Sequence, residues 1–187
     1  MLQVNRLCLV CPAGLPIASN ATFSGMMSVP VLGALAFKRV VSQMQARGAA
    51  AQWEDAEGAA FHAWHAYAAQ NVRSHPGFVR TLHRTVVEYP MDDQSANYAL
   101  IAQNRRLPVL LLWGDRDGLT PYRNAAVLHD LLPGSQLVTI VDAKHNMLIE
   151  RAQPIAEVIA AWLTDSDAKL PARVHTTLHD QSQIEGQ

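Results

Sequence analysis

The chain has 187 residues, of which 49% are hydrophobic and 17% charged, and its formal net charge at pH 7 is −1. This composition is typical of a globular protein, and a chain of this length buries roughly 70% of the surface of its unfolded state. The near-zero charge argues against a basic surface for nucleic acid or acidic lipid, so we expect neither as a partner.

The first predicted element is a buried strand over residues 4–11, ended by the turn "PAGLP". This strand contains Cys8 and Cys11 in a C-x-x-C spacing. On a strand, positions three apart point to opposite faces and lie about 10 Å apart, whereas disulfide-bonded cysteines need Cα atoms within about 7 Å. We therefore interpret the two cysteines as small buried hydrophobes rather than as a redox or metal pair.

The N-terminus shows no basic leader followed by an apolar run and a cleavage site. No apolar stretch approaches the roughly 20 residues that a membrane-spanning helix needs. We expect a soluble, cytoplasmic protein with no membrane partner.

The middle of the chain is predicted to be helical. Residues 17–35 are apolar but poorly periodic and suggest a short lid-like segment. Residues 36–105 are rich in alanine, and their periodicity predicts helices over 56–72, 77–89 and 93–104.

The pattern then changes to alternating strands and helices. "PVLLLW", residues 108–113, is a continuous apolar run typical of a strand covered on both faces in a parallel sheet. A helix over 122–132, a strand over 135–141 and a helix over 154–163 follow. This order predicts an α/β fold with a parallel sheet. Residues 165–187 are polar and unpatterned, and we expect a disordered tail there.

Polar side chains follow the two strands of this α/β region. Asp115 and Asp117 come directly after the first strand, and His145 comes four residues after Val141 at the end of the second. Because ligands and catalytic groups lie beyond the carboxyl ends of parallel strands, we expect these side chains to meet. An aspartate that accepts the ring N–H of a histidine fixes its tautomer and stabilises the imidazolium. The alternative is that both aspartates only form the turn and His145 is a surface residue.

Three stretches resemble the α/β-hydrolase superfamily, specifically its capped single-domain members. "PVLLLWGDRDGLTP" resembles the strand and acid loop of that family, and "LPGSQLVTIVDAKHNMLIERAQPIAEVIAAWL" resembles its histidine strand, loop and closing helix. "VNRLCLVCPAGLP" resembles the strand that leads into the cap. The resemblance implies a partial α/β-hydrolase fold with three parallel strands. Its core would comprise residues 1–16 and 107–164, with an inserted helical cap over 17–106.

Carried onto this chain, the resemblance implies that Asp117 is the triad acid and His145 the general base, with Asp115 as the second choice of acid. The family's nucleophile lies on a G-x-S-x-G elbow earlier in the chain. This sequence has no such motif, and neither Ser24 nor Ser135 lies at a predicted strand-to-helix turn. The oxyanion donors beside that elbow are missing with it.

The first residues match the strand that follows the nucleophile helix in the family. We therefore expect a truncated, C-terminal portion of a hydrolase, inactive alone, whose strand at 4–11 is an exposed edge available for self-association. The implied activity is hydrolysis of an ester or related bond in a small apolar substrate, without a cofactor. The alternative is a non-catalytic binding or interaction remnant.

The sequence gives less support for other chemical sites. His62 and His65 lie on one helix face and could be combined with His83, but no carboxylate or thiolate stands at ligand spacing, so no metal site is predicted. Several apolar residues of the cap could line an acyl pocket or simply pack: Met26, Met27, Trp64 and Phe78. The sequence assigns no substrate-binding residues.

Overall fold

The structure of the chain is a computed structural model that describes residues 4–16, 25–29, 31–43, 50–89, 93–165 and 169–176. The chain divides into two compact units. The sheet unit comprises residues 1–13, 52–54 and 95–187, and the helical unit comprises residues 14–51 and 55–94. None of the described helices is both long and apolar enough to cross a lipid bilayer.

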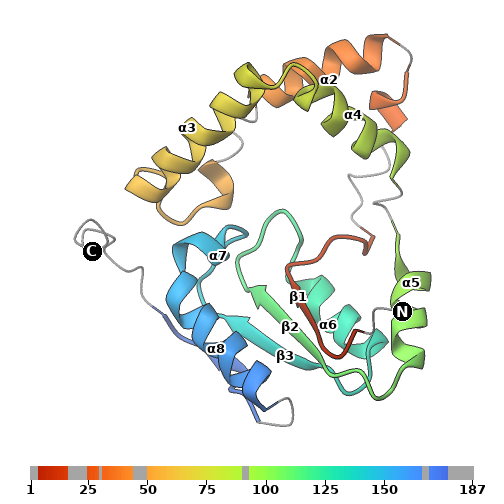
Figure 1. The fold of residues 1–187 in the computed structure, drawn as a ribbon, viewed down its shortest axis with the longest axis vertical. Coiled ribbons are helices and arrows are strands. Elements are labelled where there is room, and N and C mark those ends of the chain that lie inside the picture. The colour runs from red at the N-terminus through yellow and green to blue at the C-terminus, as the bar shows by residue number, and fades with distance from the viewer. Residues whose placement is uncertain are drawn as a thin grey trace. The chain divides into compact units, whose positions relative to one another are not determined.

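A parallel sheet of four strands organises the sheet unit (Figure 1). Its strands, in spatial order, are β1 (Leu7–Val10), β2 (Val109–Gly114), β3 (Gln136–Ile140) and β4 (Arg173–Val174). Spatial order equals chain order, and every neighbouring pair is parallel. The carboxyl ends of β1, β2 and β3 therefore meet at one edge of the sheet.

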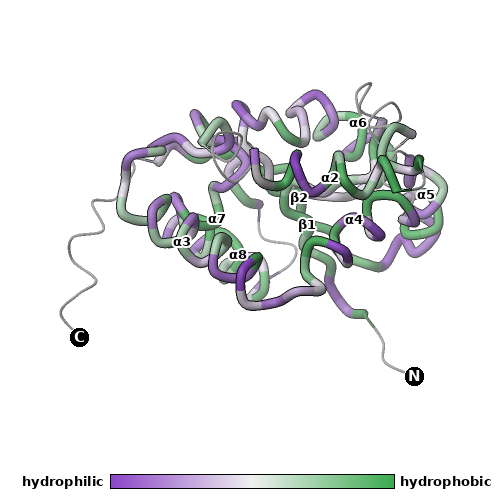
Figure 2. Tube along the Cα trace, turned by 90° about the horizontal axis from the view of Figure 1, so that it is seen from above, coloured by the Kyte–Doolittle hydropathy of each residue, from purple (hydrophilic) through white to green (hydrophobic). Residues whose placement is uncertain are grey.

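The core of the sheet unit lies around β2, whose six residues are all buried. Helices α6 (Arg123–Leu131) and α8 (Ala152–Thr164) lie on opposite faces of the sheet, as Figures 1 and 2 show. Each helix contributes fully buried side chains, Leu128 from α6 and Trp162 from α8. Because both faces are covered, β2 is apolar without alternation, as its sequence predicts. Figure 2 accordingly colours the central strands as hydrophobic.

Helix α5 (Ser95–Gln103) packs on α6. A short helix, α7 (Met147–Glu150), precedes α8. The Tyr98 hydroxyl on α5 donates a hydrogen bond to Ala13 O at 2.6 Å. This bond connects α5 to the segment that leaves β1.

The helical unit contains α2 (Leu32–Gln43), α3 (Ala59–Ser74) and α4 (Phe78–Glu88), with α4 packed on both of the others. Its core consists of Met27, Phe37 and Val41, surrounded by half-buried valines. Apolar side chains that recur at helical spacing therefore hold this unit together.

The expected strands and helices of the α/β region are present, which confirms the fold class. Two expectations are corrected. The sheet has four strands rather than three, because Thr139 and Ile140 of β3 pair with β4. Residues 169–176 of the expected disordered tail are described and include β4, while 166–168 and 177–187 lie outside the described residues. Of the expected lid, residues 17–24 and Pro30 also lie outside them.

Candidate functional site

Asp117 follows β2 in a turn that its own carboxylate holds together. Its Oδ1 accepts hydrogen bonds from the backbone N–H groups of Leu119 at 2.8 Å and Thr120 at 2.9 Å. The buried Trp113 indole N–H donates to Thr120 O at 2.8 Å. An aspartate that accepts backbone N–H groups two and three residues ahead is a turn former. The turn interpretation of the sequence is therefore correct for Asp117, and it fixes where the other oxygen points.

The loop after β3 carries His145 and docks directly on the end of β2. A Cβ atom at Gly114 would lie 2.3 Å from Ala143 O, so only glycine permits this approach. The Arg116 N–H donates to the same Ala143 carbonyl at 3.0 Å. Backbone contact, rather than side-chain packing, thus sets the distance between the two loops.

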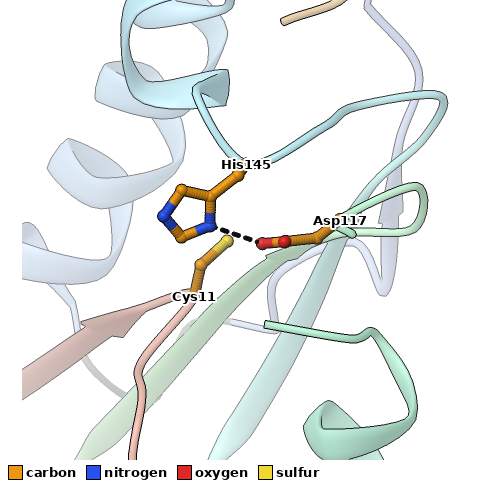
Figure 3. Close-up of side chains that lie close together, drawn as sticks. All are labelled: Cys11, Asp117 and His145. Carbon is orange, nitrogen blue, oxygen red and sulfur yellow. Dashed lines mark hydrogen bonds and ion pairs between the residues drawn. The ribbon is translucent and has the colours of Figure 1, made fainter. Parts of the chain in front are cut away.

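His145 and Asp117 form a hydrogen-bonded pair at this edge of the sheet. The distance from His145 Nδ1 to Asp117 Oδ2 is 2.9 Å (Figure 3). The Asp117 side chain is fully buried, while 27% of the His145 side chain is exposed. When Nδ1–H donates to the carboxylate, Nε2 carries the lone pair and can accept a proton. This arrangement has the geometry of an oriented general base.

The pKa of Asp117 lies below its usual value. Burial alone would raise it, but the hydrogen bond from His145, the backbone N–H of Thr120 and the charge of the imidazolium outweigh burial. The neighbouring Cys11 thiol lowers the pKa of Asp117 further. Asp117 is therefore a carboxylate near neutral pH, as the acceptor of a histidine N–H must be.

Asp115, the second choice of acid, makes different contacts. Its Oδ1 accepts the backbone N–H of Asp142 at 2.7 Å, and its Oδ2 accepts from Arg173 of β4 at 3.1 Å. Asp115 thus connects the end of β2 to the start of the His145 loop and to β4. Of the two carboxylates, Asp117 is the one that contacts His145.

Cys11, which the sequence predicts to be only a small buried hydrophobe, belongs to the same group of side chains. It is buried, but it directly follows β1 at the same edge, with a backbone φ of 41°, and its thiol lies beside the Asp117–His145 bond (Figure 3). Burial raises the pKa of this thiol, and the neighbouring Asp117 raises it further against a backbone hydrogen bond from Gly114. The sulfur lies on the Nδ1 side of the ring, so Nε2 does not face it. The common edge of the three parallel strands was the signal that could have placed Cys11 here.

These three side chains are also the described residues best suited to hold a metal ion. One ligand atom each from Cys11, Asp117 and His145 lies within 4.8 Å of the others, and thiolate, carboxylate and imidazole are donors that Zn²⁺ accepts. However, Nδ1 and Oδ2 bind each other at 2.9 Å, and burial favours the protonated thiol. The arrangement is therefore a hydrogen-bonded pair of Asp117 and His145 with a protonated thiol beside it.

The other candidates from the sequence have different surroundings. Ser135 precedes β3 and lies 2.8 Å from His129 Nδ1, so the whole strand separates it from His145. Ser24 lies outside the described residues. His83 bonds to Met27 O, whereas His62 and His65 contact the Phe61 ring, and within the described chain these histidines do not form a group of three metal donors. The expected pocket residues differ in burial: Met27 is buried, Met26 is exposed, and Trp64 and Phe78 are half-buried.

Comparison with known proteins gives one family. The model of the alpha/beta hydrolase fold family matches residues 32–152, a stretch that includes both Asp117 and His145. A comparison with curated proteins gives no match.

Among solved structures, the chain is similar to a thermophilic esterase from Thermogutta terrifontis, studied with malate bound. The identity is 16% and the TM-score 0.46, over 88% of this chain and 57% of that one. The chain thus spans little more than half the length of that esterase. The family match, by contrast, covers more than half of this chain: the protein belongs to the α/β-hydrolase fold family.

Proposed function

We propose that the chain carries the acid and the base of a serine-hydrolase type of site, which cleaves an ester or related acyl bond in a small apolar substrate. Asp117 orients the His145 imidazole, and its negative charge stabilises the imidazolium that forms when His145 accepts a proton at Nε2. The observation that carries this proposal is the 2.9 Å bond between His145 Nδ1 and the fully buried carboxylate of Asp117. Specificity is assigned to the helical segment over 17–106.

The nucleophile is the part of this chemistry that the sequence does not display. There is no G-x-S-x-G motif in the 187 residues, and the nearest thiol, Cys11, is on the wrong side of the imidazole to give its proton to Nε2. General-base catalysis without a positioned nucleophile and oxyanion donors loses most of the rate enhancement of acyl transfer. We therefore expect the 187-residue chain alone to be inactive.

The absent motif also favours a second candidate, a non-catalytic binding or interaction protein that retains the family fold. The two candidates differ in whether a reactive serine accompanies His145 in the polypeptide that carries this sequence in its native cell. A fluorophosphonate probe labels such a serine, because it forms a stable adduct with a nucleophile activated by histidine.

The test applies the fluorophosphonate probe separately to the recombinant chain and to the native polypeptide. The native polypeptide is captured by an antibody raised against this sequence. We expect no fluorophosphonate adduct on the recombinant chain, and an adduct on the native polypeptide that is lost in the His145→Ala variant. An unlabelled native polypeptide without ester hydrolysis would favour the non-catalytic candidate. An adduct on the recombinant chain would contradict the expected inactivity and identify the nucleophile by mass spectrometry.

A further inference from the structure

The short segment Gln52–Glu54 is part of the sheet unit although the sequence on both sides of it belongs to the helical unit. Trp53 is 1% exposed, so the centre of this segment is fully buried. In the sequence these residues lie within the expected cap and have no predicted role. Their contacts lie on the loop that carries His145.

Two consecutive carbonyl groups of this segment bind the two neighbours of His145. Gln52 O accepts from the Asn146 backbone N–H at 3.2 Å and from its side-chain amide at 3.3 Å. Trp53 O accepts from Lys144 Nζ at 2.8 Å. The residues before and after His145 are thus both hydrogen-bonded to the Gln52–Glu54 segment.

Glu54 anchors the other end of the segment. Its backbone N–H donates to the carboxylate of Glu150 at 2.9 and 3.1 Å. Its side chain forms an ion pair with Arg151, whose Nε lies 3.2 Å from Glu54 Oε1. Arg151 is 4% exposed and Glu150 is 8% exposed, so this anchor is shielded from water. Shielded charges with matched partners hold a fixed geometry better than exposed ones.

The same segment also reaches the loop that carries Asp117. A Cβ atom at Gly118 would lie 4.0 Å from both Nε2 and Oε1 of Gln52, so the Gln52 amide lies over the residue that follows Asp117. The Gln52–Glu54 segment therefore binds the His145 loop and lies close to the Asp117 loop. Ala143, at the start of the His145 loop, is already fixed by the hydrogen bond from the Arg116 N–H to its carbonyl.

We propose that the Gln52–Glu54 segment is a positioning element that holds the His145 imidazole against Asp117. The proposal rests on the proposed function of that pair. With Ala143 held by the end of β2, and with Lys144 and Asn146 held by this segment, the backbone around His145 has little freedom. A general base requires such restraint, since displacements of about 1 Å cost on the order of 100-fold in rate.

Two variants release the segment in different ways. Glu54→Gln removes one charge of the pair with Arg151 and keeps the shape of the side chain. Lys144→Met removes the donor to Trp53 O and keeps an unbranched apolar chain. Glu57→Gln and Lys169→Met are matched controls, because both side chains belong to exposed residues. Thermal unfolding of each full-length variant shows whether the core remains folded.

Two readouts by NMR distinguish positioning from a merely structural role. Hydrogen exchange of the Asn146 amide reports its bond to Gln52 O, and the strongly deshielded proton signal of His145 Nδ1–H reports the bond to Asp117. Asp117→Asn identifies that signal by abolishing it. We expect Glu54→Gln and Lys144→Met to accelerate Asn146 exchange about tenfold or more, by raising the population of the locally open loop. We expect both to broaden the Nδ1–H signal, and we expect neither change in the controls.

Unchanged exchange of Asn146 in both variants would overturn the proposal, and so would fast exchange with an unchanged Nδ1–H signal. If Glu54→Gln does not fold, Lys144→Met alone decides. A wild-type protein without the Nδ1–H signal would instead show that the pair itself is not formed. That result contradicts the proposed function, and it is distinguishable because it is seen before any variant is made.

Discussion

At the scale of single residues, Asp117 performs two tasks with its two oxygens. Oδ1 accepts the backbone N–H groups of its own turn, and Oδ2 accepts hydrogen bonds from His145 Nδ1–H and from the Thr120 hydroxyl at 2.9 Å. The sequence posed turn former and catalytic acid as alternatives, but the structure shows the turn and the histidine contact together. A buried carboxylate with this many donors has a fixed orientation.

Replacement of this carboxylate tests the assignment of roles. Asp117→Asn places an amide nitrogen where one of the donors now binds, and we expect a loss of about 2 kcal/mol in the free energy of unfolding. Urea unfolding followed by circular dichroism measures this free energy. Asp117→Asn should also abolish the NMR signal of His145 Nδ1–H, whereas the matched control Asp115→Asn should leave that signal unchanged. Equal loss of the signal in both variants would contradict the assignment of Asp117 as the partner of His145.

The lowered pKa of Asp117 predicts a dependence of stability on pH. A carboxylate whose pKa is lower in the folded state stabilises the fold fully above its unfolded pKa of about 3.9. That contribution is lost as the pH falls through the lower, folded-state pKa. Between pH 6 and acid pH, we expect the unfolding free energy of the wild type to fall more steeply than that of Asp117→Asn. If the unfolding free energies of the two proteins fall in parallel with pH, the carboxylate is not stabilised by its hydrogen-bond donors.

Gly114 gives a third prediction at the residue scale. Gly114→Ala would place a Cβ 2.3 Å from Ala143 O, so the His145 loop must shift away from the end of β2. We expect a destabilisation of about 1–3 kcal/mol, together with a weakened His145 Nδ1–H signal. Gly77→Ala is the control, because a Cβ there meets no atom within 4 Å. Equal stability of both variants, measured by urea unfolding, would mean that this close approach is not required.

At the scale of elements, the sequence predicted what depends on local pattern. β2 follows from its uninterrupted apolar run, and α6 and α8 begin and end within about two residues of the predicted bounds. The meeting of Asp117 and His145 followed from a general property of parallel sheets, whose carboxyl ends share one edge. Local pattern and one topological rule therefore predicted that the two loops meet, and the family resemblance selected Asp117 over Asp115.

Features that depend on contacts between distant residues were not predictable in the same way. β4 has two residues, one of them the exposed Arg173, and forms only because β3 offers a free edge. The left-handed backbone of Cys11 and the docking of Trp53 have no local signature. Each is decided by long-range packing, which periodicity and residue preference do not contain.

At the scale of the whole molecule, β1 is the edge of the described sheet and pairs there only with β2. We propose that this edge supports self-association, since an unpaired strand edge is a template for another strand. The N–H of Leu7 donates to Pro108 O and that of Cys11 to Leu112 O, so by alternation the N–H of Cys8 points to the open side.

Cys8→Pro tests this edge because it removes an outward donor and leaves the bonds to β2 in place. We expect the wild type to show concentration-dependent association in sedimentation velocity and the variant to sediment as a smaller species. Cys8→Ala serves as the control for loss of the thiol. A wild type that remains monomeric at high concentration would refute the proposed use of the edge.

For the whole molecule we propose that His145, oriented by Asp117, is the base of a hydrolytic site. The most direct test of this proposal is kcat/KM for a chromogenic short-chain ester, measured on the native polypeptide that carries this sequence. His129→Ala is the control, because that histidine bonds to Ser135 at the other end of β3. We expect His145→Ala to lower kcat/KM by about 1,000-fold or more, and His129→Ala to leave it nearly unchanged. Equal kcat/KM in the wild type and His145→Ala would contradict the proposal.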